Sequence, residues 1–259
     1  YGWEPKTNQE ALGWYEGFIN VLQPCLRSGD LDRRSRARKI IANHFRSLWS
    51  FVGCHNVLEE LVVSQCKIDQ WVEIWQPIKQ AIGFDGKNFS PLVLRRLEAL
   101  EVLTCPSDLH AEIETYVFRP VWDHYQANED FNEVEKRVSE KIVDLGRQVS
   151  FDLPYLESLG SRLYQSENAS LLLFGRGLAK GAHSQGDMFN FLVDLLQSHD
   201  YELKRSHMFS GMIQEIHSSN QVLARQLREK VLDIPKLSSH FVELLTSTDL
   251  EPWGIELLL

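Results

Sequence analysis

Apolar residues recur along this chain at steps of three and four, which is the spacing of one face of an α-helix. Residues 36–52 show the pattern most clearly, and they leave Arg36, Arg38, Lys39 and Arg46 largely off the apolar face. The apolar positions there are Ala37, Ile40, Ile41, His44, Phe45, Leu48, Trp49 and Val52. No segment alternates polar and apolar residues in the way that indicates a strand. The pattern therefore predicts an all-α fold.

Capping residues, prolines and glycines mark the ends of these helices, as where Ser90 precedes Pro91. About fourteen helices are expected, near 8–27, 31–53, 56–66, 70–82, 91–104, 107–119, 130–149, 153–165, 170–181, 185–198, 206–217, 219–231, 236–247 and 252–258. Antiparallel helix pairs of this length, stacked in order, form an α-solenoid. We expect one continuous solenoid with N-terminal helices in 1–54, central repeats in 55–150 and C-terminal repeats in 151–259. A compact helical bundle is the alternative.

The composition is that of an ordinary globular protein. The 259 residues are 43% hydrophobic and 24% charged. No apolar run approaches the roughly 20 residues of a membrane-spanning helix, so we expect no membrane partner. The four cysteines form no Cys-x-x-Cys pair, which favours buried free thiols and a cytoplasmic location.

The net charge of −9 is unevenly distributed. The first 50 residues carry a balance of +3, and the remaining 209 carry −12. The cations that form a candidate partner-binding face are Arg33, Arg34, Arg36, Arg38, Lys39 and Arg46. A solvated helix face is the commoner outcome for such a stretch. Nucleic acid is an unlikely partner because most of the chain is acidic and no aromatic residues interleave with these arginines.

A stretch rich in glycine, from Gly175 to Gly181, is the strongest local candidate for chemistry. Its glycines and Lys180 stand in the wrong order for a phosphate-binding loop, and no Ser or Thr follows the lysine. We therefore expect Gly175, Gly177 and Gly181 to serve close packing between helices. No nucleophile elbow, two-histidine zinc helix or paired carboxylates occur, so we assign no catalytic residue, cofactor site or metal ligand.

Several short elements occur in an order that resembles one protein family. They are Ala37-Arg38, His44–Trp49, Trp75–Ile78, Leu97–Leu100, Pro106–Leu109, Ile113–Val117 and Phe174–Gly181. The order is similar to that of the helical-repeat region, of the tetratricopeptide or HEAT type, C-terminal to the NTPase core of bacterial STAND-type NTPases. The Avs-like anti-phage defence proteins belong to this group. The resemblance covers about 37–181, and it departs at Met188-Phe189, where the family helix usually carries a tryptophan.

This resemblance implies a sensor segment that recognises a phage protein, such as a structural protein, and so relieves autoinhibition of the parent protein. ATP and Mg²⁺ would belong to an upstream NTPase core, since this chain has no Walker motif, and self-association would occur through the parent protein. The start at Tyr1 and the apolar end at Leu257–Leu259 also lead us to expect a segment of a longer polypeptide. The alternatives are a nucleic-acid-engaging or accessory helical domain of a larger enzyme, which would use the Arg33–Arg46 face, and a structural spacer.

Overall fold

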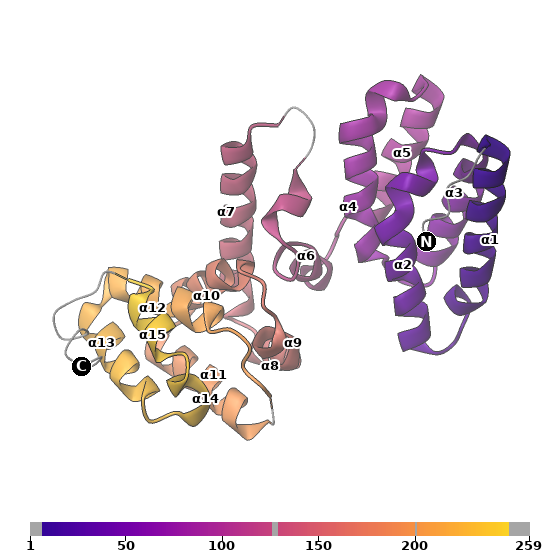
Figure 1. Cartoon of the computed structure of the whole chain (residues 1–259). Helices are drawn as coiled ribbons and strands as arrows, with labels where there is room; N and C mark the ends of the chain where they lie inside the picture. The colour runs from indigo at the N-terminus through magenta and orange to yellow at the C-terminus, as the bar shows by residue number, and fades with distance from the viewer. Residues whose placement is uncertain (1–6, 126–128, 200, 249–259) are drawn as a thin grey trace. The chain divides into compact units, whose positions relative to one another are not determined.

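The computed structural model describes residues 7–125, 129–199 and 201–248, and in this part of the chain the regular structure is entirely helical (Figure 1). Fifteen α-helices occur there, which confirms the all-α prediction. None of the described helices is both long and apolar enough to cross a membrane. The chain divides into two compact units, Tyr1–Ala111 with His124–Asp130, and Glu112–Asp123 with Phe131–Leu259. The boundaries expected after residues 54 and 150 both fall inside a unit.

Unit 1 is built around its second helix. Its elements are α1 (Asn8–Leu26), α2 (Leu31–Trp49), the short η1 (Val52–Cys54), α3 (His55–Cys66), α4 (Val72–Gln80), the π-helical turn η2 (Ala81–Asp85), η3 (Gly86–Asn88) and α5 (Pro91–Thr104). Helix α2 packs against α1 and α4. Its side chains Phe45, Leu48 and Trp49 are fully buried, so the apolar stripe of the sequence forms the centre of this core.

Helix α6 (Leu109–Tyr116) and the short η4 (Val121–His124) both cross the boundary between the units. The remaining elements belong to unit 2 and are α7 (Phe131–Val149), α8 (Leu153–Ser158), α9 (Gly160–Gln165), α10 (Ser170–Gly181), α11 (Gln185–Ser198), α12 (His207–Ser219), α13 (Gln221–Val231), α14 (Pro235–Ser238) and α15 (Phe241–Thr246). Helix α10 packs against both α7 and α12 and is the centre of this unit.

The glycines of α10 lie where neighbouring backbones come closest. A β-carbon on Gly175 would overlap the carbonyl oxygen of Met208 in α12. On Gly177 it would overlap the carbonyl oxygen of Val143 in α7, and on Gly181 it would come 2.6 Å from the carbonyl oxygen of Arg147. All three glycines therefore allow α10 to pack directly against the backbone of a neighbouring helix.

Most helix boundaries follow the sequence, and the differences have local causes. The helices predicted at 91–104, 170–181 and 185–198 have those bounds. The helix predicted at 153–165 is divided into α8 and α9, where Gly160 lies against the side chains of Leu195 and Tyr201. The helix predicted at 236–247 is likewise divided, into α14 and α15, and the one predicted at 252–258 lies outside the described residues.

A carboxylate at the start of α15 ties that helix to α12. Oε1 of Glu243 lies 3.2 Å from Nδ1 of His207, and Oε2 lies 3.5 Å from Nδ1 of His240. Burial alone would raise the pKa of Glu243. Hydrogen bonds from Ser206 and His240 and the charge of His207 outweigh that effect, so its pKa is lowered.

A lowered pKa of Glu243 predicts a stability contribution that is complete above its unfolded-state pKa of roughly 4.3. It is lost as the pH falls through the lower folded-state pKa, because the folded protein then has to take up a proton. We expect Glu243→Gln to lower the melting temperature at pH 7 and the difference from wild type to shrink toward pH 3. Thermal unfolding followed by circular dichroism measures the melting temperatures of wild type and variant, and Glu202→Gln at an exposed position is the control. A difference that does not change with pH would contradict this assignment.

Candidate functional site

Two of the arginines of α2 that the sequence singles out, Arg34 and Arg38, turn inward toward acceptors of unit 1 itself. Arg38 is only 6% exposed. Its Nε donates to Oε1 of Gln65 at 3.0 Å, its Nη2 donates to the Gln65 carbonyl oxygen at 3.0 Å, and its Nη1 pairs with Asp69. Arg34 pairs with the second carboxylate oxygen of Asp69 at 3.1 Å. The prediction that Arg38 lies off the buried face is wrong, because Gln65 supplies buried acceptors and Asp69 a half-exposed carboxylate that helical periodicity cannot indicate.

Two further cations of the predicted face also have partners in unit 1. Nε of Arg46 pairs with Asp85 at 2.5 Å, and its guanidinium carbon lies 4.9 Å from the ring centroid of Phe84. Nε of Arg33 donates to Sγ of Cys25 at 3.3 Å. The hydrogen bond with Asp85 raises the pKa of Arg46. These side chains therefore stabilise unit 1 as well as presenting charge.

Only two of the six predicted cations are exposed and form neither an ion pair nor a side-chain hydrogen bond with a described residue. They are Arg36 and Lys39, which lie on the outer face of α2. The structure therefore does not bring the six cations together as one surface. Gly175, Gly177 and Gly181 lie in unit 2, inside its packed helices.

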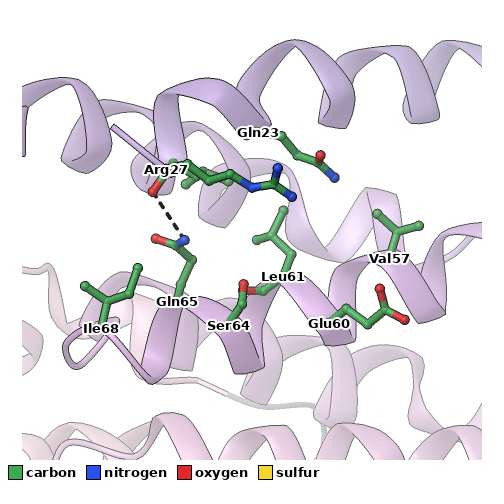
Figure 2. A pocket seen from close by; sticks show the side chains of 9 residues that line it. Gln23, Arg27, Val57, Glu60, Leu61, Ser64, Gln65 and Ile68 are labelled. Atoms are coloured by element: carbon green, nitrogen blue, oxygen red, sulfur yellow. Dashed lines mark hydrogen bonds between the residues drawn. The ribbon is translucent and has the colours of Figure 1, made fainter. Parts of the chain in front are cut away.

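A groove of about 330 Å³ lies elsewhere in unit 1, between the C-terminal end of α1 and α3 (Figure 2). Its lining residues are Gln23, Leu26, Arg27, Val57, Glu60, Leu61, Ser64, Gln65 and Ile68. Figure 2 shows Gln23 and Arg27 extending from α1, while Leu61, Ser64 and Glu60 lie on α3 on the opposite side. The groove therefore has an apolar floor and charged edges.

The local sequence explains how both walls form. Gln23, Leu26 and Arg27 are spaced three and four apart at the end of α1 and share one face. Val57 and Leu61 are four apart on α3, and the other α3 residues of the groove follow the same spacing. Two helix faces with this spacing, one on each side, line the groove.

Gln65 fixes the floor of the groove by joining three helices. Its Nε2 donates to the carbonyl oxygen of Leu26 at 3.3 Å, and its Oε1 accepts from Nε of Arg38. The carbonyl oxygen of Leu26 is one of the last four of α1, which have no partner inside the helix. The buried amide of Gln65 therefore caps α1, and Arg38 of α2 fixes the orientation of that amide.

The edges of the groove carry charges with no internal partner. Arg27 and Glu60 are exposed, and neither forms an ion pair with any described residue. The side-chain amide of Gln23 likewise forms no hydrogen bond within the described part of the chain. Ser64 donates its hydroxyl to the carbonyl oxygen of Leu61 at 2.8 Å, so its oxygen can only accept. The groove thus offers a cation on α1, an anion on α3 and apolar surface between them.

Comparison with known proteins adds no relative. The chain matches no family model, no curated protein and no solved structure.

Sequence reasoning did not single out the groove. Arg27 and Glu60 look like ordinary surface charges in the sequence, since each follows the helical period at the edge of an apolar stripe. The signal that could have found them is a hydrogen-bonding Gln65 on the apolar face of α3, because a buried amide needs a partner from another element. The identity of that partner depends on which helices are neighbours, and periodicity does not supply it.

Proposed function

We propose that this chain is a protein-interaction segment, the helical sensor region of a bacterial STAND-type NTPase of the anti-phage defence class. The order of its sequence elements supports the family. The observation that carries the interaction function is the outer face of α1, where Trp14 is 50% exposed and Val21 is 74% exposed. Clustered exposed aromatic and aliphatic residues are typical of protein-binding surfaces.

The backbone of α1 is also accessible on this side. Gly13 and Gly17 are exposed, and a β-carbon added to either would meet no other atom within 4 Å. Trp14 stacks on Phe18 with ring centroids 5.7 Å apart, so its indole is held in place before a partner arrives. Because the Trp14 side chain is already ordered beside exposed glycine backbone, a partner that binds there loses little conformational entropy of this side chain. This favours recognition of a folded protein.

The glycine-rich stretch does not suit a nucleotide site. Its glycine-rich stretch lies within α10, where Gly175 and Gly177 contact the backbones of α12 and α7 and leave no room for phosphates. In this proposal ATP and Mg²⁺ bind an NTPase core outside these 259 residues. Binding of a phage protein to the segment shifts the parent protein from its autoinhibited to its open state, because the ligand prefers the open state.

The nucleic-acid alternative is weakened by the pairing of Arg34, Arg38 and Arg46 with carboxylates of unit 1. Arg33, Arg36 and Lys39 remain to contact phosphates from that face, which predicts weak binding with a shallow salt dependence.

The test measures association of this chain, and of the full-length protein containing it, with phage structural proteins such as portal and terminase. Biolayer interferometry gives the affinity. We expect Val21→Asp to weaken binding at least tenfold, since it places a charge on the contacted face. The matched control is Val222→Asp on α13, which is similarly exposed at 69% and should leave the affinity unchanged. Failure of the full-length protein to bind any structural protein of the phages it restricts would overturn the proposal.

A further inference from the structure

We propose that the groove between α1 and α3 binds a segment of a partner protein in which one acidic and one basic side chain flank an apolar residue. The acidic side chain would pair with Arg27, the basic one with Glu60, and the apolar one would contact Leu61. This inference rests on the proposed interaction function and names the chemistry of the partner at one site.

The two edges of the groove carry charges of opposite sign. Arg27 and Glu60 stand on opposite walls of the same groove, and each is exposed without an ion pair among the described residues. Among the residues that line the groove, these two alone are charged. A ligand with both signs of charge complements the two edges, whereas a ligand of one sign would be repelled by one of them.

The floor of the groove is apolar and preformed. Between the charges lie Leu26 and Leu61, which are 2% and 6% exposed, with Val57 beside them. The hydrogen bonds of Gln65 to Leu26 and Arg38 hold α1 and α3 in register below the groove, so the site is formed before binding. A preformed floor of this size accommodates an aliphatic side chain such as leucine.

The open form of the groove decides between a protein segment and a small molecule. Arg27, Glu60 and Ser64 are all exposed, and Ile68 at its end is 53% exposed. Small-molecule sites bury roughly 70–90% of their ligand, which a groove with such exposed edges does not do. A groove lined by helix faces on both sides instead suits a peptide lying along it, with side chains as anchors.

The experiment uses the chain itself and a defined set of capped peptides. In each peptide one Glu and one Lys flank a Leu in an otherwise alanine and serine background, with the charges three to eight residues apart and in both orders. Controls carry two Glu, two Lys, or the same residues with Leu replaced by Ser. Binding is read from ¹H–¹⁵N shifts of the backbone amides of Gln23, Arg27, Glu60 and Ser64, and from the Kd obtained by titration.

We expect at least one Glu–Leu–Lys arrangement to shift these amides with a Kd tighter than each control. Arg27→Glu or Glu60→Lys should each weaken it about three- to tenfold, the range of an exposed ion pair turned into a repulsion. The double variant should prefer the arrangement with Glu and Lys exchanged. Both residues are exposed, so the variants keep the fold, which circular dichroism verifies.

Three outcomes would overturn the inference. The first is the absence of groove shifts with every peptide at millimolar concentration. The second is binding that ignores the charge exchange in the double variant. The third is shifts of equal size with free glutamate or lysine, which would indicate a small zwitterion as the ligand. If, in these cases, the chain still binds phage proteins and Val21→Asp still weakens that binding, the groove inference is wrong and the proposed function stands. If the groove binds peptides in a charge-dependent way but the full-length protein binds no phage protein, the groove inference stands and the proposed function is wrong.

Discussion

Gly177→Ala should destabilise unit 2 although alanine is the better helix former. A β-carbon there would overlap the carbonyl oxygen of Val143 and lie 2.9 Å from Cα of Gly146. Both neighbours are backbone atoms of α7, so no side-chain rotation relieves the contact and the helices must separate. Overpacking of this kind costs about 1–3 kcal/mol, occasionally more. The intrinsic helix gain of about 1 kcal/mol from glycine to alanine is smaller, so we expect a net loss of stability.

The opposite face of α10 predicts the same result independently. Gly175→Ala would drive a β-carbon into the carbonyl oxygen of Met208 and separate α10 from α12. The matched control is Gly186→Ala in α11, where the nearest atom is Cδ1 of Leu223 at 3.7 Å, an ordinary contact. We expect the control to keep or slightly raise the free energy of unfolding. Urea titration followed by circular dichroism measures all three variants, and a Gly177→Ala protein as stable as wild type would contradict this packing.

The sequence predicts the helices of this chain well because their signals are local. Ser90 accepts from the backbone N–H of Val93, and Pro91 occupies the first helical position, so α5 begins where the cap predicts it. Within α2, the periodic positions Ala37, Ile41, Phe45 and Leu48 are all buried. Periodicity and caps depend only on near neighbours in the chain, which explains this agreement.

The sequence predicts the site poorly because the site depends on which helices are neighbours. The stripe of α2 includes Ile40, yet this side chain is 39% exposed, while Arg38 is buried. Gln65 and Asp69, more than 25 residues further along the chain, pair with the guanidinium and so allow Arg38 to be buried. The groove likewise combines residues of α1 and α3 that no local pattern links.

Arg38→Met should lower the stability of unit 1 by about 1–3 kcal/mol. Methionine keeps the apolar stem of the side chain but removes the donors to both the Oε1 and the carbonyl oxygen of Gln65. Oε1 of Gln65 is then left without this donor, and a buried acceptor without a partner costs about 1–3 kcal/mol. The carbonyl oxygen of Gln65 keeps the backbone N–H groups of Ile68 and Asp69, so its loss adds little. Asp69 adds little to the loss, because its side chain is 46% exposed and it keeps its pair with Arg34.

The control lies two residues away on the same helix. Arg36 is exposed and forms no ion pair with a described residue, so Arg36→Met should change the free energy of unfolding by less than about 0.5 kcal/mol. Both variants remove one positive charge, so a general charge effect would move them equally. Urea denaturation measures the difference. Equal stability of the two proteins would show that Arg38 belongs to an exposed basic face, as the sequence predicts, and that the network through Gln65 does not hold α1, α2 and α3 together.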